Sequence, residues 1–273
     1  MKKIIEPVSL SSTLNIVETT PELKQIWEYS KKLFPSFSEH FSFPIDNKEN
    51  EHRLRLLITA EVYFTKMAIE PIIKTRDVCS YADIGDCDGS VRVILKEFFY
   101  GDKLKSVGVN LQQDAVKKII ARGLDAICAD ALDIHNQAKT YDLISVFETL
   151  EHLPDPIGFL KNIRQTTNST LIISVPYIRK SRVSLRYLTS RWPKKTKPTI
   201  ENTHIFELSP MDWKKIFLHT GWKVEKEYKL LAFKPFTPHR LILEPYWRYA
   251  SFEGFWFVAL GKTDQYSSLY SIE

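Results

Sequence analysis

The sequence predicts an α/β protein built on a doubly wound, mostly parallel seven-stranded sheet with a helical extension at the N-terminus. Three observations lead to this prediction. Short apolar segments alternate with helical segments from about residue 77 onward, a glycine-containing turn follows the first apolar segment, and helical periodicity covers residues 51–75. We therefore expect a helical extension or cover over 1–76 and the sheet domain over 77–273.

The expected elements follow one another in regular order. A helix over 21–33 and a longer one over 51–75 come first. The clearest helix boundaries lie further on, where Ser209 and Asp212 form a capping-box-like pattern around Pro210 and Gly221 follows the helix. The predicted strands cover 78–84, 105–110, 125–129, 141–147, 169–176, 222–231 and 254–261, with helices over 89–99, 112–122, 155–166 and 209–220 and insertions over 177–204 and 232–253.

The bulk composition is that of a globular chain in a reducing compartment. The chain has 273 residues, of which 44% are hydrophobic and 26% charged, enough for one large domain. No apolar run approaches the roughly 20 residues that span a bilayer, and no signal peptide is evident, so we expect a cytoplasmic protein without a transmembrane segment. The three cysteines, Cys79, Cys87 and Cys128, form neither a disulfide framework nor zinc-site spacing. A net charge of +5 does not by itself indicate nucleic acid.

The first strand of the predicted sheet ends in the acid-and-glycine segment Asp83-Ile84-Gly85-Asp86-Cys87-Asp88-Gly89-Ser90. Open parallel sheets bind ligands beyond the carboxyl ends of their strands, where glycine lets the backbone approach a ligand. The segment resembles the first motif of class I S-adenosylmethionine-dependent methyltransferases, an acid followed by Gly-x-Gly-x-Gly. The resemblance implies a Rossmann-like fold, with Asp83 close to the methionine part of the cofactor and the turn of Gly85, Asp86 and Gly89 beside it.

Two positions depart from the family pattern. Cys87 stands where the middle glycine is usual, and Asn110 stands where an acid normally accepts hydrogen bonds from both ribose hydroxyls. An amide oxygen can accept such a bond, but without a charge the bond is weaker. We still assign Asn110 and the adjacent Leu111 to the cofactor site, with reduced cofactor affinity as the expected consequence.

Later segments match the family in order. Ala129-Asp130-Ala131 follows the third strand, where the resemblance implies an acid near the adenine amine, and the fourth strand runs through Phe147 into Leu150-Glu151-His152-Leu153-Pro154-Asp155-Pro156. The resemblance covers about 100 residues and implies S-adenosylmethionine as cofactor, with Asp130, Ala131 and Phe147 in its site. The alternative interpretations are a simple tight turn at the glycines, a helix cap at Asp130, and a degenerate scaffold that has lost the cofactor.

The candidate chemistry residues are Glu148, Glu151, His152 and His204. The E-x-x-E-H spacing predicts Glu148 and Glu151 one helical turn apart, at the carboxyl end of the fourth strand. The pattern is similar to that of small-RNA 3′-terminal 2′-O-methyltransferases and of ubiquinone-biosynthesis O-methyltransferases. In the former the two Glu and two His hold a metal, so the resemblance implies a divalent cation, Mg²⁺ or Mn²⁺, on these four residues.

The same residues have two other interpretations. Methyl transfer to a hydroxyl needs a group that removes its proton, and His204, with His152 and Glu151, can do this without a metal. Alternatively, Glu151 and His152 order a turn and His204 is structural. The sequence leaves the three interpretations open.

The substrate side of the sequence is basic and aromatic. Residues 179–197 contain eight Lys or Arg and no acid, which fits either a clamp for an anionic acceptor or a solvated surface. Aromatic residues between 233 and 256 could stack on a sugar or base, or belong to the core.

The sequence therefore favours S-adenosylmethionine-dependent methyl transfer to a hydroxyl of a small molecule, with a sugar or glycan precursor as the preferred acceptor. The first alternative is an RNA ribose 2′-O-methyltransferase, which the absence of an RNA-binding module disfavours. The second is a non-catalytic protein of the same fold. The sequence does not determine the oligomeric state.

Overall fold

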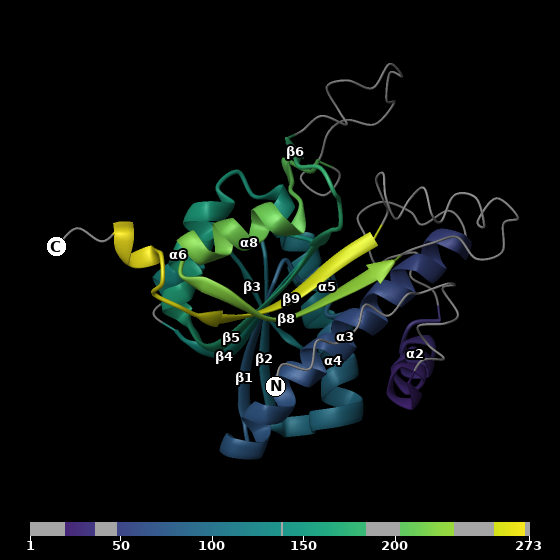
Figure 1. The fold of residues 1–273 in the computed structure, drawn as a ribbon. Helices are drawn as coiled ribbons and strands as arrows, with labels where there is room; N and C mark the ends of the chain where they lie inside the picture. The colour runs from purple at the N-terminus through teal and green to yellow at the C-terminus, as the bar shows by residue number, and fades with distance from the viewer. Residues whose placement is uncertain (1–19, 36–47, 138, 184–202, 232–253, 271–273) are drawn as a thin grey trace, which may run out of the picture.

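The structure is a computed structural model that describes residues 20–35, 48–137, 139–183, 203–231 and 254–270. A seven-stranded sheet in the order β3-β2-β1-β4-β5-β9-β8 forms its centre (Figure 1). The first five strands pair in parallel, and β9 runs antiparallel to both β5 and β8. The strands are β1 (Cys79–Ile84), β2 (Leu104–Asn110), β3 (Asp125–Cys128), β4 (Tyr141–Phe147), β5 (Thr167–Pro176), β8 (Trp222–Leu231) and β9 (Gly254–Lys262).

Apolar strands covered on both faces explain this sheet. All seven residues of β4 are buried, as are five of the six in β1, which is the near-continuous apolar pattern of a parallel strand between helical layers. The predicted fold class, a mostly parallel Rossmann-like sheet with a helical N-terminal region, is confirmed. The helices around the sheet are α4 (Ser90–Leu95), α5 (Gln113–Ala121), α6 (Pro156–Thr166) and α8 (Pro210–His219).

Side-chain caps set where the helices begin. Asp155 caps α6 by accepting the Gly158 N–H at 2.8 Å, and the Ser209 side chain accepts the Asp212 N–H at the start of α8. In both helices proline occupies the first turn, where its missing N–H costs nothing. The predicted ends of these helices therefore agree with the structure to within a residue.

The longer of two N-terminal helices covers one face of the sheet, and the shorter one packs on it. Helix α2 (Pro21–Leu33) packs on α3 (Lys48–Arg76), which crosses the sheet and packs against β1 and β4 (Figure 1). Their apolar side chains share one core cluster with residues of β1, β4 and β9. Phe64 of α3, for example, lies 5.7 Å from Phe257 of β9, measured between ring centroids.

The structure differs from the sequence prediction in details of length. The helix predicted over 89–99 ends as α-helix at Leu95 and continues as the π-helical turn η1 (Lys96–Tyr100), followed by the 3-10 turn η2 (Gly101–Lys103). Another 3-10 segment, η3 (Ala131–Gln137), follows β3 and was not predicted. Most of the two predicted insertions, including Phe233, Phe236 and Trp247, lies outside the described residues. Within the described residues, no helix is both long and apolar enough to span a membrane.

Candidate functional site

The turn after β1 needs glycine at two positions. Gly85 has φ +84° and Gly89 has φ +79°, a region that other residues enter only with strain. A Cβ on Gly85 would also lie 2.0 Å from Oγ1 of Thr149, in the turn after β4. The Gly85 N–H donates to the Val109 carbonyl of β2 at 2.8 Å, so the turn is fastened to both neighbouring strands. The conformation of this turn therefore favours glycine at both positions whether or not a cofactor binds.

Asp86 braces this turn from inside. One oxygen accepts the Gly89 N–H at 2.7 Å, and the other forms an ion pair at 2.7 Å with Arg92, whose side chain is fully buried. Gly108 in β2 makes room for the pair, because a Cβ there would lie 2.5 Å from Nη2 of Arg92. Both carboxylate oxygens of Asp86 are therefore occupied by the protein. Its predicted role toward the cofactor stays a prediction.

Asp83, at the end of β1, accepts a chain of hydrogen bonds. The Ser145 hydroxyl of β4 donates to Asp83 at 2.6 Å. Since that hydroxyl has only one proton, the Tyr81 hydroxyl donates to Ser145, at 2.7 Å. Burial, reinforced by the charge of Asp86, raises the pKa of Asp83 to about 8 even though Ser145 and Arg92 oppose the shift. Asp83 forms no ion pair with any described residue.

Asn110 holds the ends of two strands together. Its amide nitrogen donates to the Asp86 carbonyl at 3.0 Å, and its amide oxygen accepts the Gln112 N–H at 2.8 Å. An aspartate could not make the first of these bonds, because it has no N–H. The asparagine that departs from the family pattern therefore has a structural role in this turn. The adjacent Leu111 is exposed.

The remaining predicted cofactor residues lie at the same edge of the sheet. Asp130 is exposed and accepts the Leu132 N–H at 2.9 Å, which is the cap-like role considered as its alternative interpretation. Ala131 begins η3 directly after it. Phe147 ends β4 with its ring 6.1 Å from that of Phe257. The carboxyl ends of β1 to β4 thus bring the predicted set to one edge.

Glu148 does not sit on a helical turn with Glu151, as the spacing had predicted. Its φ is +43°, and the 3-10 turn η4 spans only Leu150–His152. The Glu148 carboxylate accepts the Ser174 hydroxyl at 2.9 Å, and the Glu148 N–H donates to the Ser174 carbonyl at 3.1 Å. The end of β5 therefore holds Glu148 away from the regular i,i+3 position. Burial and the charge of Glu151 raise its pKa well above the ordinary value.

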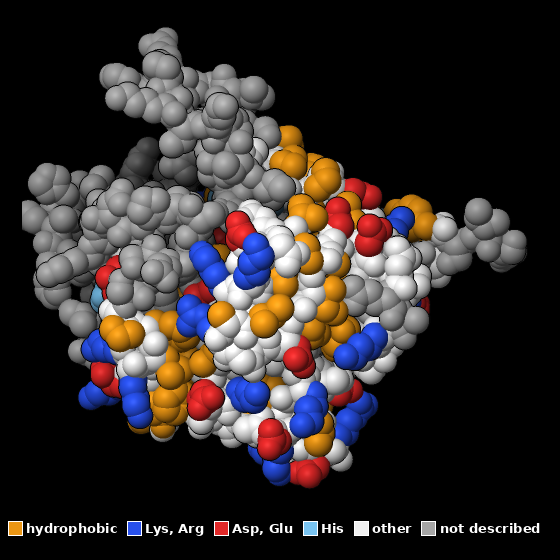
Figure 2. Space-filling view, turned by 180° about the vertical axis from the view of Figure 1, so that it is seen from behind, with side chains coloured by type: hydrophobic (Ala, Val, Ile, Leu, Met, Phe, Trp, Pro, Cys, Tyr) orange, Lys and Arg blue, Asp and Glu red, His pale blue; other side chains and the backbone are white. Residues whose placement is uncertain are grey.

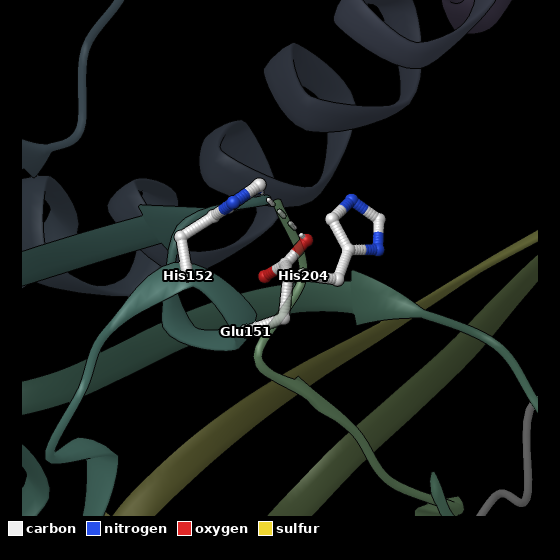
Figure 3. Close-up of side chains that lie close together, drawn as sticks. All are labelled: Glu151, His152 and His204. Carbon is white, nitrogen blue, oxygen red and sulfur yellow. Dashed lines mark ion pairs between the residues drawn. The ribbon is translucent and has the colours of Figure 1, made fainter. Parts of the chain in front are cut away.

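Glu151, His152 and His204 come together after β4 (Figure 3). One potential ligand atom from each lies within 4.8 Å of the others. The Glu151 carboxylate points between the two imidazoles, and Nε2 of His152 lies 3.8 Å from it. Neither carboxylate oxygen of Glu151 has a hydrogen-bond partner among the described residues, although both are buried. Burial raises the pKa of Glu151 to about 8.

Each imidazole is oriented through its other nitrogen. Nδ1 of His152 donates to the Thr203 carbonyl at 2.9 Å, and Nδ1 of His204 pairs with the Glu207 carboxylate at 3.0 Å. Both acceptors require a proton on Nδ1, so in the neutral form of either imidazole Nε2 carries the lone pair. The Ile205 N–H donates to the Glu151 carbonyl at 2.8 Å and joins this segment to η4.

Sequence reasoning missed Glu207, which holds His204 in place. Glu207 lies in β7 (Phe206–Glu207), which pairs with β6 (Arg182–Val183), and Arg182 forms an ion pair with it. The hydrogen bond with His204, followed by Arg182, lowers the pKa of Glu207 to about 2, so it stays ionised. The sequence feature that could have identified Glu207 is its position three residues after His204. Arg182 belongs to the basic segment 179–197, of which only residues 179–183 are described.

Three of the four predicted metal ligands thus form a group, and Glu148 lies outside it. A bound ion holds its ligand atoms at about 2.0–2.2 Å, so two ligands of one ion are at most about 4.4 Å apart. Separations of up to 4.8 Å would have to shorten by a few tenths of an ångström. The carboxylate oxygens of Glu151 have no hydrogen-bond partner among the described residues, and both imidazoles are held through Nδ1. These three side chains could therefore supply ligand atoms to such an ion.

The strand order, the glycine turn after β1 and the polar groups after β4 define a Rossmann-like class I methyltransferase fold. The family model of the methyltransferase domain matches residues 80–227, more than half of the chain. The chain belongs to this methyltransferase family. No curated protein sequence matches it.

Solved structures agree on the fold. Magnesium protoporphyrin IX methyltransferase from Synechocystis PCC 6803 with bound SAM has a TM-score of 0.53 at 10% identity, covering 89% of this chain and 98% of that one. The N-terminal domain of EvdMO1 with bound SAH has a TM-score of 0.51 at 12% identity, covering 88% and 96%. The cyclase SpnF reaches 0.53 at 12% identity, covering 94% and 99%. At such low identity these similarities establish the fold alone.

Proposed function

We propose that this chain is an S-adenosylmethionine-dependent methyltransferase that methylates a hydroxyl oxygen of a small molecule, with a sugar or glycan precursor as the favoured acceptor. Family membership supports the methyl transfer. The observation that carries the choice of a hydroxyl acceptor is the pair of His204 and Glu207, in which an ionised carboxylate holds Nδ1–H and leaves Nε2 of His204 to accept a proton beside Glu151 and His152.

Two features of the described residues fit the cofactor. Gly85 and Gly89 keep the backbone of the turn after β1 free of side chains. Asp83 is buried there without an ion-pair partner among the described residues, and S-adenosylmethionine carries an ammonium and a sulfonium that would complement its charge. Bound S-adenosylmethionine supplies a methyl group on a sulfonium leaving group, and we assign its site to the carboxyl ends of β1 to β4.

Residues of this chain would orient the acceptor hydroxyl and remove its proton. His204 Nε2 takes the hydroxyl proton as the acceptor oxygen attacks the methyl carbon, and Glu207 stabilises the imidazolium that results. His152 and Glu151 orient the hydroxyl beside His204. The balance is one C–O bond formed, one C–S bond broken with its electron pair on sulfur, and one proton moved to His204.

A divalent cation on Glu151, His152 and His204 is the second candidate arrangement for the same reaction. The unpartnered oxygens of Glu151 favour it. Mg²⁺ or Mn²⁺ would lower the pKa of a bound hydroxyl, with the two imidazoles as ligands rather than as proton acceptors.

The described residues give little support to the alternative function, an RNA ribose 2′-O-methyltransferase. On the face seen in Figure 2, basic and acidic side chains are interspersed among the described residues rather than gathered into one basic surface. Arg182, from the basic segment, is paired with Glu207.

Calorimetric titration tests this proposal. The protein is titrated with S-adenosylmethionine and S-adenosylhomocysteine, each with and without Mg²⁺ or Mn²⁺, and we expect micromolar binding that Asp83→Ala abolishes. Hydroxylated acceptors are then screened for release of S-adenosylhomocysteine. Absence of binding under every condition would support the degenerate scaffold instead. A change in acceptor turnover on adding either metal would favour the cation arrangement over the metal-free base.

A further inference from the structure

Glu61 of α3 is a buried acid that lies outside the group of Glu151, His152 and His204. The residue is 7% exposed. It forms neither a hydrogen bond nor an ion pair with any residue that the structure describes. A buried carboxylate without a partner is costly as an anion, and a cationic ligand beside it would offset that cost.

The packing of α3 places Glu61 over the ends of β1 and β4. Helix α3 contacts both strands. Phe64, one helical turn after Glu61 and on the same side of α3, packs 5.7 Å from Phe257. Phe257 in turn lies 6.1 Å from Phe147, the last residue of β4. This chain of contacts brings the Glu61 face of α3 to the edge of the sheet at which the cofactor site is proposed.

Four other carboxylates lie near Glu61. The charges of Asp83, Glu148, Asp86 and Asp88 act in that order, after burial, to raise its pKa well above the ordinary value. Asp86 is neutralised by Arg92 and Asp88 by Arg122. Among the described residues, neither Glu61 nor Asp83 forms an ion pair with an arginine or lysine. This part of the site therefore carries uncompensated acid and suits a cationic ligand.

A second polar group on the same face also lacks a partner. The hydroxyl of Thr65, one turn after Glu61, is buried and makes no hydrogen bond with the described residues. Helical threonines usually donate to the carbonyl four residues earlier, as Thr59 does to Arg55 at 2.7 Å. The Glu61 face of α3 therefore carries a carboxylate and, one turn later, a buried hydroxyl, neither with a hydrogen-bond partner among the described residues.

We propose that Glu61 is a cofactor-binding residue whose carboxylate accepts a hydrogen bond from the ammonium group of S-adenosylmethionine. This assignment rests on the proposed function. The ammonium is chosen over the sulfonium because only the ammonium has N–H groups to donate, and a carboxylate without a donor is what the structure presents. The N-terminal helices would then complete the cofactor site as well as covering the sheet.

The test compares wild type, Glu61→Gln and Glu70→Gln by titration calorimetry with three ligands. Gln keeps the shape of a protonated Glu61, so the fold is preserved, but it cannot ionise to pair with an ammonium. Glu70 is the matched control, since it lies on the same helix but pairs with Lys66 near the surface. The ligands are S-adenosylmethionine, S-adenosylhomocysteine, which keeps the ammonium but not the sulfonium, and 5′-methylthioadenosine, which has neither.

We expect Glu61→Gln to weaken the binding of S-adenosylmethionine and of S-adenosylhomocysteine by a similar factor of roughly 10 to 100. The affinity for 5′-methylthioadenosine should not change. Glu70→Gln should change none of them. Equal weakening of all three, no weakening, or a loss confined to S-adenosylmethionine would each overturn the assignment. Wild-type protein that binds none of the three would instead overturn the proposed function, and this assignment with it.

Discussion

Asp83, Asp86 and Asp88 all lie buried around the turn after β1, yet their carboxylates have different partners. Asp86 pairs with Arg92, and Asp88 pairs with Arg122 while accepting the Ser90 N–H at 3.0 Å. Asp83 has only hydroxyl and distant charge interactions. Because its charge is the least compensated, Asp83 is the residue of the three whose ionisation responds most to pH and to a cationic ligand.

The stability of the protein should fall as pH rises from about 5.5 to 8.5, in part because of Asp83. The folded-state pKa of about 8 lies above the ordinary value of 3.8, so the folded protein binds this proton more tightly than the unfolded chain. The stabilisation is therefore complete below pH 3.8 and is lost as pH rises through about 8. Urea unfolding should show Asp83→Asn losing roughly 1–3 kcal/mol less than wild type over this interval.

A parallel pH dependence in wild type and Asp83→Asn would mean that Asp83 is already ionised at pH 5.5. Glu151, whose pKa is also raised to about 8, contributes equally to both proteins and cancels in the comparison.

His204→Ala should lower turnover by a factor of about 10² to 10⁴ while leaving the affinity for S-adenosylmethionine unchanged. His204 is braced by Glu207 and faces Glu151, but it lies on the acceptor side rather than in the turn after β1. Turnover is measured with an acceptor found in the screen, and affinity by calorimetry. His219→Ala is the control, because that imidazole is paired with the Tyr270 hydroxyl at the surface. Intact turnover in His204→Ala would exclude it as the base.

At the scale of elements, the turn between β1 and α4 depends on a buried ion pair. Arg92 projects from α4, Asp86 from the turn, and Gly108 of β2 leaves the space for both. The sequence motif indicated the glycines of this turn. The structure shows that the buried Arg92 guanidinium, paired with Asp86, also stabilises the conformation of the turn. Breaking a buried pair leaves one charge uncompensated, which is far more costly than losing a surface pair.

Arg92→Met should destabilise the fold by about 3–5 kcal/mol, whereas Arg122→Met should cost clearly less. The two arginines pair with neighbouring acids, but the Arg92 side chain is fully buried and that of Arg122 is 32% exposed. Chemical denaturation measures both. Adding Asp86→Asn to Arg92→Met should recover part of the loss. Equal costs for the two single variants would show that burial does not decide the strength of the pair.

At the scale of the whole molecule, the N-terminal helices and the sheet share one hydrophobic core. Buried residues of α2 and α3 belong to the same cluster as Tyr81 of β1, Phe147 of β4 and Phe257 of β9. The division into an extension over 1–76 and a domain over 77–273 remains a prediction. The shared core supports a cover that folds with the sheet rather than a separate unit.

Phe64→Ala should destabilise the protein by about 3–5 kcal/mol and keep a single unfolding transition. Phe64 is 3% exposed and joins α3 to Phe257 of the sheet. Far-ultraviolet circular dichroism and tryptophan fluorescence should shift to the same midpoint, since the tryptophans lie in both parts, for example Trp27 in α2 and Trp222 in β8. Two separated transitions would show that the N-terminal helices unfold on their own.

The sequence by itself determined the fold class and predicted where the site lies. Apolar periodicity and capping residues are local signals, so β4, α6 and α8 could be predicted closely, and the ordered motifs pointed to the carboxyl ends of β1 to β4. Only the tertiary structure decided the partners of each polar group. The structure places Glu148 outside a regular helical turn, pairs Asn110 with the backbone of two loops, and sets Glu207 beside His204. It also buries Glu61 in a helix that packs against β1 and β4. These relations join residues far apart in the chain, and the energies of burial and pairing that govern them have no local signature in the sequence.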